Sequence, residues 1–414
     1  MNLGSFTRSG ESIGFINALF TSASASCVTG LTVVNTASYW NLTGQIIILC
    51  LIQIGGIGIM SLATIFPLIL GKKIDLKNRQ LLREQFSVSS YSGIVRLLKY
   101  ILLFSFSVES IGALILATRF VPRYGIFKGL WYSIFQSVSA FCNAGFDNLG
   151  DSIYPFRYDP IVNVVIMALI VIGGLGFLVN QEILRKKSFK KLSVHSKLVL
   201  LISAVLILLG ALGFFVLEYS NKNTIATESI ATKIGQSFFQ SVNTRTSGFY
   251  SAQFAGLRDA TSFLLILLMF IGGSPGSTAG GLKTTTLGVL VLSSFSAIKG
   301  ENETVVFNRS IHQQTIRKAL ALVMVSLLLI ISVSFILTIV EEMPFIDFLF
   351  ETVSAYATVG LSKGITSYLS TMSKVFLTIT MYLGRVGPLT LGYAISNRHR
   401  QSRLRYPDVD IAIG

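Results

Sequence analysis

A short pattern that begins with phenylalanine and ends with glycine occurs four times along this chain. The copies run from Phe20 to Gly30, from Phe135 to Gly145, from Phe239 to Gly248 and from Phe350 to Gly360. Each copy precedes an apolar segment long enough to cross a bilayer, and all but the first also follow one. Since four half-membrane hairpins in one polypeptide can surround a central hole, this repetition predicts an ion pore.

The composition supports a membrane location. Of the 414 residues, 51% are hydrophobic and only 13% are charged, which lies outside the range of soluble domains. Apolar runs such as Ala319–Val340 match the thickness of the hydrocarbon core. We therefore predict an all-α polytopic membrane protein with no sizeable domain outside the membrane. It is not expected to be an enzyme, because the sequence assembles no nucleophile, paired acids or metal cluster near a membrane face.

The net charge of +15 is concentrated on one side of the predicted membrane. Lysine and arginine gather within residues 72–99, 185–197, 299–318 and 398–405, opposite the four glycine motifs. The positive-inside rule makes this side cytoplasmic, so we predict a multi-pass protein of the cell membrane with cytoplasmic basic loops and a cytoplasmic C-terminus. Contact with anionic lipid headgroups of the bilayer explains most of this charge. Nucleic acid is not expected as a partner, because the basic loops are short and lack interleaved aromatic residues.

Neither the cysteines nor the glycine-rich stretch points to a bound cofactor. Cys27 and Cys142 occupy the same place in two of the motifs, so a metal pair there is an alternative to simple packing of a small residue. Gly276–Gly281 has the spacing of a Walker phosphate loop, but Leu282 stands where lysine is required and Lys283 comes one place late. We expect no organic cofactor.

The repeat unit is predicted to be an outer helix, a re-entrant loop and an inner helix around a central ion pore. It divides the chain into residues 1–71, 72–190, 191–300 and 301–414. The first repeat has only its loop, Phe15–Leu31, and its inner helix, Leu42–Leu70, because residues 1–11 are polar and too short for an outer helix. A truncated start is favoured over true absence of that helix. The complete repeats are expected at Ile94–Phe120, Leu130–Phe146 and Asp159–Leu184; at Ser193–Ser220, Ala231–Tyr250 and Leu257–Ser296; and at Ile316–Glu341, Phe345–Leu361 and Ser373–Ile395.

A second glycine-rich signature lies downstream of each motif glycine. Its copies are Gly55–Gly58, Gly173–Gly176, Gly272–Gly281 and Gly384–Pro388. For the first two copies, close helix packing explains the glycines as well as a pore function does. The third copy contains Pro275 and five glycines, so it cannot remain a regular helix. Because irregular backbone at membrane depth survives only inside protein or beside water, this break predicts a flexible element in the pore.

The motif glycines have the chemistry that a cation filter requires. Rings of backbone carbonyls replace the hydration shell of K⁺ in potassium channels, and glycine accepts the unusual dihedrals that point carbonyls inward. The short helices before the glycines would also aim their negative C-terminal dipoles at the ion. A loop used only for packing would explain neither the regularity nor the glycine. The four expected helices are Phe20–Ser26, Phe135–Phe141, Phe239–Thr244 and Phe350–Tyr356.

Three charged residues fall within the membrane segments. Arg385 replaces the second glycine of the last signature and is expected to face the pore beside the glycine-rich break, where it can bond loop carbonyls. A purely structural pairing is the alternative. Arg245 would repel cations if it were free, so we expect it to point behind the loop and to bond carbonyls or Glu351. Glu109 is expected to be buried and hydrogen-bonded rather than ion-binding.

These motifs resemble the Trk/Ktr/HKT family of potassium transporters, and within it the KtrB-type membrane subunits. The resemblance covers nearly the whole chain. It departs from the family pattern at the first outer helix, which leaves seven full spans instead of eight. The matching segments are Cys27–Leu31, Asn143–Phe146, Thr244–Phe249, Ala357–Leu361, Ile52–Gly58, Gly384–Thr390 and Arg405–Asp408.

The resemblance implies K⁺ transport, passive or coupled to Na⁺, with K⁺ held at the four motif glycines. Glycine in all four repeats favours K⁺, and a Na⁺-selective or Na⁺/K⁺-symporting member is the alternative. The implied filter residues are Cys27, Val28, Thr29 and Gly30; Cys142, Asn143, Ala144 and Gly145; Thr246, Ser247 and Gly248; and Ala357, Thr358, Val359 and Gly360.

The resemblance also implies a gate and protein partners. KtrB-type subunits form homodimers and sit on a cytosolic, KtrA-like ring of nucleotide-binding regulatory subunits. This chain contains no such regulatory domain, which fits a separate partner. The implied gate is the intramembrane loop with one arginine: Gly272, Gly273, Ser274, Pro275, Gly276, Ser277, Thr278, Ala279, Gly280, Gly281 and Arg385.

Overall fold

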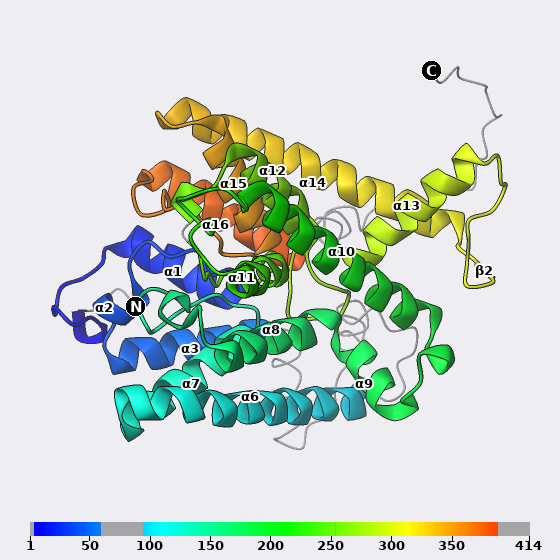
Figure 1. Cartoon of the computed structure of the whole chain (residues 1–414). Helices are drawn as coiled ribbons and strands as arrows, with labels where there is room; N and C mark the ends of the chain where they lie inside the picture. Colours follow the sequence, from blue (N-terminus) through cyan, green and yellow to red (C-terminus); the bar gives the residue numbers. More distant parts are fainter. Residues whose placement is uncertain (1–3, 59–93, 253, 388–414) are drawn as a thin grey trace.

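The computed structural model describes residues 4–58, 94–252 and 254–387, and almost all of the regular structure in these ranges is helical. Within them, three helices are long and apolar enough to span a bilayer by themselves: α6 (Ile94–Tyr124), α10 (Val194–Glu218) and α14 (Gln313–Val340). In Figure 1, α6 and α14 run across the molecule at its lower and upper edges. These are the three outer helices that the hydrophobic runs predict.

Four shorter helices lead to the motif glycines. They are α1 (Phe15–Cys27), α7 (Ile126–Phe141), α11 (Ile230–Asn243) and α15 (Phe345–Ala357). Each begins well before the phenylalanine that opens the sequence motif. That phenylalanine is completely buried in every copy and anchors its helix in the core: Phe20, Phe135, Phe239 and Phe350.

The inner helices are shorter than the sequence predicts. They are α3 (Leu42–Ile57), α8 (Pro160–Leu175), α12 (Asp259–Phe270) and α16 (Thr371–Val386). The first, second and fourth end at a glycine with positive φ, which regular helix does not allow: Gly58, Gly176 and Gly387.

Over the described residues, three of the seven expected spans are continuous helices, namely α6, α10 and α14. Two others are bent or interrupted, the second of them at the break that the sequence predicts. After Gly176, α8 turns by 101° into α9 (Phe177–Lys186), so the span expected at Asp159–Leu184 is bent. The span expected at Leu257–Ser296 is broken between α12 and α13 (Thr284–Ile298). The expected continuations of α3 to Leu70 and of α16 to Ile395 lie outside the described residues.

A minor exception to the all-α prediction follows α13. Strands β1 (Val305–Val306) and β2 (Arg309–Ser310) pair antiparallel, with Val305 opposite Ser310. The remaining described elements are short helical turns: η1 (Gly4–Phe6), α2 (Thr36–Tyr39), η2 (Tyr154–Phe156), η3 (Phe189–Lys191) and η4 (Phe254–Gly256).

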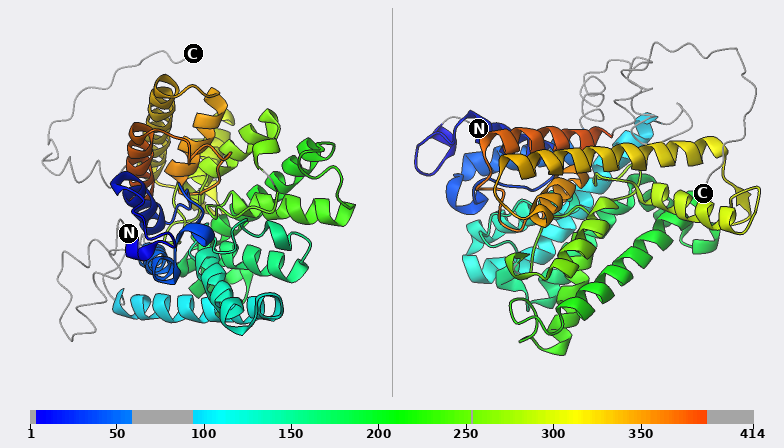
Figure 2. Two further views of the ribbon diagram at one scale, coloured as in Figure 1. Left: turned by 90° about the vertical axis from the view of Figure 1, so that its left-hand side faces the viewer. Right: turned by 90° about the horizontal axis from the view of Figure 1, so that it is seen from above.

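The four quarters of the sequence follow one another around a centre. In the left view of Figure 2 their colours run round the molecule from blue through cyan and green to orange. Each short helix contacts the inner helix of the preceding quarter: α7 contacts α3, α11 contacts α8, and α15 contacts α12. The circle closes because α1 contacts α16, the last inner helix. The buried core lies between the short helices and the longer helices around them.

Candidate functional site

The four motif glycines form a closed ring at the centre of the helices. A Cβ placed on Gly30 would lie 3.1 Å from the Cα of Gly145, and one placed on Gly145 would lie 2.8 Å from the Cα of Gly248. From Gly248 the corresponding distance to the Cα of Gly360 is 3.3 Å, and from Gly360 to the Cα of Gly30 it is 2.9 Å. The order around the ring follows the sequence. The four segments that end at these glycines are called strands below, although they form no β-sheet: residues 27–30, 142–145, 245–248 and 357–360. The second and fourth strands face each other across the ring.

Carbonyl groups surround these glycines and leave no room for a side chain. A Cβ on Gly145 would lie 2.6 Å from the carbonyl oxygen of Ser247, and one on Gly248 would lie 2.6 Å from that of Val359. A Cβ on Gly30 would overlap the carbonyl oxygen of Ala144. Each of these oxygens belongs to the residue just before the next glycine in the ring. The ring therefore places backbone carbonyls from neighbouring strands close together.

The four strands share an unusual backbone. Two residues before each glycine, φ is positive: 59° at Val28, 59° at Asn143, 67° at Thr246 and 53° at Thr358. Three of these residues are β-branched, for which this conformation is rare and costs about 1–3 kcal/mol. The same conformation in four separate segments means that the surrounding structure imposes it, as is common at functional sites.

A pocket of about 440 Å³ lies on one side of the ring and is lined by all four glycines. Two carboxylates, the half-buried Asp147 and the buried Glu351, hold the segments that border it. Asp147 accepts hydrogen bonds from the backbone N–H groups of Gly150 and Ser152, both at 2.8 Å, and from Gln136 Nε2 at 2.6 Å. On the opposite side of the ring, Glu351 of α15 accepts hydrogen bonds from the hydroxyls of Ser362 and Thr366. Each carboxylate ties the segment after a ring glycine to the short helix before it.

The break predicted in the third inner helix is present and is slightly longer than expected. The chain is not helical from Ile271 to Lys283, between α12 and α13, and this segment is called the central loop below. Thr278 Oγ1 donates to the carbonyl oxygen of Phe141 at 3.2 Å and to Asn143 Oδ1 at 3.1 Å. A Cβ on Gly281 would lie 3.1 Å from the Cα of Ala357. The central loop thus contacts two strands that face each other across the ring.

Arg385 lies beside the central loop. Its Nη1 donates to the carbonyl oxygen of Thr278 in the loop, and its Nη2 donates to the carbonyl oxygen of Gly55 on α3. One guanidinium thereby links α16, the loop and α3. Lys283, whose Nζ donates to the carbonyl oxygen of Ala279 at 2.8 Å, adds a second cation to the loop. In the sequence, Lys283 stands out only as a misplaced Walker lysine, although its position inside the predicted break could have identified it as a residue of this loop.

Of the two other charged residues, Glu109 has the environment that the sequence predicts and Arg245 has a different one. Glu109 is buried and accepts from Gln53 Nε2 at 3.0 and 3.2 Å, which confirms its hydrogen-bonded role. Arg245 is also buried, but its Nη2 donates to Ser203 Oγ on α10 at 3.3 Å. The expected partners, carbonyl oxygens or Glu351, are wrong: the guanidinium bonds a hydroxyl, and the Glu351 oxygens accept from hydroxyls of their own quarter.

The two equivalent cysteines lie in the core. Cys27 and Cys142 are both buried free thiols, and Cys142 Sγ lies 3.8 Å from Glu109 Oε1 and 3.7 Å from Gln53 Oε1. The described residues contain no group of three or more His, Cys, Asp or Glu that could hold a metal ion. The metal-pair alternative therefore finds no support in this environment.

Close packing explains the glycine signatures of the inner helices. Added Cβ atoms on Gly55, Gly173 and Gly384 would overlap the carbonyl oxygens of the residues four places before the ring glycines, namely Ser26, Phe141 and Tyr356. In the third quarter, Gly272 faces the carbonyl oxygen of Gly280 instead, so the central loop takes the place of the short helix. These glycines let the inner helices approach the ends of the short helices.

Replacing Gly384 by alanine is expected to lower the free energy of unfolding by about 3 kcal/mol, because the new methyl group overlaps backbone that cannot move freely. Gly235→Ala on α11 is the matched control: nothing lies within 4 Å of its added Cβ. Thermal unfolding of both purified variants in detergent measures the difference. Equal midpoints for the two variants would contradict the packing role of Gly384.

The helices and the glycine ring define a polytopic membrane protein of the cation-transporter class. The chain belongs to the TrkH family of cation transport proteins, whose family model matches residues 2–404, and it is therefore a transporter rather than an enzyme.

Individual relatives and a solved structure agree with this family. The Ktr system potassium uptake protein B of Bacillus subtilis (strain 168) is 44% identical over 402 residues, covering 97% of this chain and 90% of the relative. The potassium/sodium uptake protein NtpJ of Enterococcus hirae is 41% identical over 421 residues, covering 100% and 93%. The crystal structure of the potassium transporter TrkH from Vibrio parahaemolyticus has a TM-score of 0.74 at 20% identity and covers 93% of this chain and 79% of that one. That similarity supports the same fold.

Proposed function

We propose that this chain is the membrane subunit of a Ktr/Trk-type K⁺ uptake system and that K⁺ crosses the ring of four glycines. The observation that carries this proposal is the closed ring itself, with one glycine and one adjoining carbonyl from each quarter. Backbone carbonyls are the groups that replace the hydration shell of K⁺. Relatives named as potassium and as potassium/sodium uptake proteins support this cargo, and Na⁺-coupled transport is the second candidate.

The surroundings of the ring favour a cation in two ways. The C-terminal ends of α1, α7, α11 and α15 lie next to the ring, and their dipoles place partial negative charge there. The pocket of about 440 Å³ on one side is lined by Asp147 and Lys363, and Lys363 is paired with Asp347 at 2.5 Å, so the charge left over at this entrance is negative. Such a field raises the local concentration of cations at the filter.

The central loop is proposed to be the gate. It contacts Asn143 of one strand and Ala357 of the facing strand, so it crosses below the ring on the side away from the pocket. Arg385 and Lys283 both donate hydrogen bonds to loop carbonyls. Their positive charges oppose the passage of a cation in this conformation, in addition to the steric obstruction. Conduction then requires the loop to move away from the axis.

The proposed assembly follows from the Ktr relatives and from the charge distribution. The relative in B. subtilis is named protein B of a Ktr system, which supports a separate Ktr partner protein. The assembly proposed for this chain is a homodimer that binds a KtrA-like cytosolic ring. The positive-inside rule places the basic segment after α9 (residues 185–191) in the cytoplasm. In this orientation the pocket faces outward and the central loop faces the regulatory partner.

Flux of K⁺ or Rb⁺ into reconstituted vesicles tests the proposed function. Vesicles that contain the protein are expected to take up the ion faster than empty vesicles when K⁺ and Na⁺ are varied separately. A rate that rises with Na⁺ at constant K⁺ would favour the coupled form. If no condition gives K⁺ flux above that of empty vesicles, with the regulatory ring present or absent, the proposal is wrong.

Shortening the central loop is expected to raise basal flux without changing ion preference. Deletion of residues 277–279 removes the hydroxyl of Thr278 that holds the loop to Phe141 and Asn143. Deletion of residues 301–303, which lie between α13 and β1, is a control of equal length. The measurement is Rb⁺ uptake by vesicles in the absence of the ring. Flat or reduced flux in a folded 277–279 deletion would show that the loop is only a packing break.

A further inference from the structure

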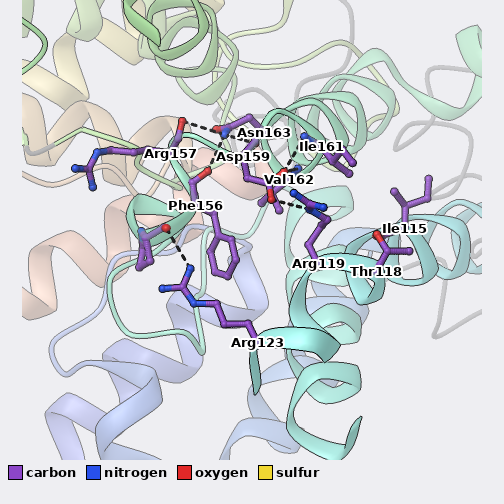
Figure 3. A network of polar contacts seen from close by, with 11 residues as sticks. Ile115, Thr118, Arg119, Arg123, Phe156, Arg157, Asp159, Ile161, Val162 and Asn163 are labelled. Atoms are coloured by element: carbon purple, nitrogen blue, oxygen red, sulfur yellow. Dashed lines mark hydrogen bonds and ion pairs between the residues drawn. The ribbon is translucent and has the colours of Figure 1, made fainter. Parts of the chain in front are cut away.

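A groove of about 530 Å³ lies between the end of α6 and the beginning of α8 (Figure 3). Two arginines one helical turn apart, Arg119 and Arg123, line it from α6, and Asp159 lines it from the start of α8. Phe156 and Tyr158 complete its aromatic side. None of these residues belongs to the glycine ring or to the central loop.

The groove carries one positive charge in excess. Arg119 Nε pairs with Asp159 Oδ2 at 2.7 Å, and Asp159 Oδ1 caps α8 by accepting from the N–H groups of Ile161 and Val162. The Arg123 guanidinium donates to the carbonyl oxygen of Pro155 at 3.4 Å, and its central carbon lies 4.7 Å from the centre of the Phe156 ring. Over the residues that the structure describes, no carboxylate forms an ion pair with Arg123.

The length of α6 places these arginines at the level of lipid headgroups. Arg96 and Arg119 lie on the same helix, 23 residues apart in the numbering, which corresponds to about 35 Å along the axis. The hydrocarbon core is about 30 Å thick, so the two ends of this stretch lie just outside it. Tyr158, with 58% of its surface exposed, lies at the same end, where aromatic residues are enriched at membrane interfaces.

Apolar surface continues from the groove toward the middle of the membrane. On α6, Ile111 and Leu114 are 58% and 69% exposed, and on α8, Ile161 and Val164 are 40% and 58% exposed. Figure 3 shows Ile115 of α6 and Ile161 of α8 next to Arg119. A ligand with a charged head and apolar chains would therefore find complementary surface at the level of the headgroups and at the level of the hydrocarbon core.

The Arg119–Asp159 pair joins the two helices, and Arg123 is not needed for that link. At the same place in the third quarter, Glu218 of α10 accepts from Arg258 N at 3.1 Å and from the hydroxyl of Thr261. In the fourth quarter, Glu341 accepts from Ser370 N at 2.7 Å and from Ser373 Oγ at 2.6 Å. Both carboxylates accept from the backbone N–H of the N-cap residue of the following inner helix. In the second quarter, Asp159 caps α8 itself, and the outer helix carries two arginines instead of a carboxylate. Helix capping does not account for the second positive charge, Arg123, whereas an anionic ligand does.

We propose that this groove binds the phosphodiester headgroup of an anionic glycerophospholipid in the leaflet on the pocket side of the membrane. Asp159 uses only the Nε of Arg119, so the two Nη groups of Arg119 are available to phosphate oxygens in the bidentate geometry that guanidinium favours. One excess positive charge matches the single negative charge of a phosphodiester. The acyl chains lie along the exposed apolar faces of α6 and α8. The orientation proposed above makes this the outer leaflet.

Lipid retention by the purified protein tests this site. Detergent-purified protein is incubated with phosphatidylglycerol, and bound lipid is counted by native mass spectrometry while thermal unfolding is followed in parallel. Each arginine-to-glutamine change is expected to weaken retention about fivefold, and Arg119→Gln with Arg123→Gln about 25-fold. Arg258→Gln is the matched control, because Arg258 is exposed at the start of another inner helix and its side chain contacts Ser220. It should retain lipid like the wild type.

Three further arms make the result decisive. Arg123→Gln alone leaves the Arg119–Asp159 pair intact, and an unchanged unfolding midpoint of this variant shows that its loss of retention is not caused by misfolding. Replacement of both arginines by lysine keeps the charge and should restore part of the retention. Equal retention by the wild type and the double glutamine variant would overturn the proposal, as would inorganic phosphate that displaces the lipid and stabilises the protein to the same extent. The assay measures no ion flux, so its outcome is independent of the proposed transport function.

Discussion

Replacement of Gly30 by serine is expected to lower K⁺ flux about tenfold or more, a change in barrier of about 1.4 kcal/mol or more, and to reduce the preference for K⁺ over Na⁺. The added Cβ would overlap the carbonyl oxygen of Ala144, and φ of 92° at this position strains any side chain. The carbonyl must move, so the ring no longer presents oxygens at the distance that K⁺ requires. Rb⁺ and Na⁺ uptake by vesicles that contain the variant measures both effects.

Gly364→Ser is the matched control for this change. Gly364 lines the same pocket and also has a positive φ of 89°, but nothing lies within 4 Å of an added Cβ. Its strain is therefore similar while the ring stays intact, and its ion preference should equal that of the wild type. Serine at Gly145, Gly248 and Gly360 completes the series. Unchanged selectivity in all four single variants would exclude the ring as the filter.

Replacement of Arg385 by alanine is expected to raise basal flux about fivefold or more in the absence of the regulatory ring, a shift of about 1 kcal/mol toward the open state. The change removes the hydrogen bonds from α16 to Thr278 of the central loop and to Gly55 of α3. It also removes a positive charge beside the proposed ion path. The variant should consequently respond less than the wild type when the nucleotide-loaded ring is added. Rb⁺ uptake with and without the ring measures both quantities.

Lys374→Ala supplies the control on the same helix. Lys374 lies near the beginning of α16, whereas Arg385 lies in its last turn. Loss of this cation should leave basal flux and the response to the ring unchanged. If Arg385→Ala keeps wild-type basal flux and full dependence on the ring, Arg385 has a structural role and the proposed gating mechanism is incorrect.

Local physical chemistry made part of the site predictable. The three outer helices follow from continuous apolar runs, because only helices satisfy backbone hydrogen bonds in hydrocarbon. The central loop follows from Pro275 and its glycines, which exclude a regular helix whatever surrounds them. By contrast, the bend after α8 was missed. The sequences of Gly55–Gly58 and Gly173–Gly176 are nearly the same, so they do not indicate a bend in the second of them. The 101° change of direction at Gly176 occurs where this glycine packs against the carbonyl group of Pro275 in the central loop.

The hydrogen-bond partners of the buried charged residues were also only partly predictable from the sequence. Glu109 is buried and hydrogen-bonded as expected, because a carboxylate in the middle of an apolar helix must find donors. The predicted partners of Arg245 were wrong, since several polar groups lay within plausible reach and the guanidinium donates to Ser203 of α10 instead. The groove of Arg119 and Arg123 was not identified from the sequence at all. It exists because the segment before α8 returns to the end of α6.

By itself the sequence determined that this is a helical membrane protein, that a glycine motif recurs four times, and that the third inner helix is interrupted. These properties depend on hydrophobicity and on backbone freedom, which act over a few neighbouring residues. Only the tertiary structure decided that Gly30 and Gly360 are direct neighbours, that the central loop lies between facing strands, and that Arg385 reaches Gly55 in addition to the loop carbonyl that the sequence predicts. These contacts join residues hundreds of positions apart, and their geometry depends on how all four quarters pack around one centre.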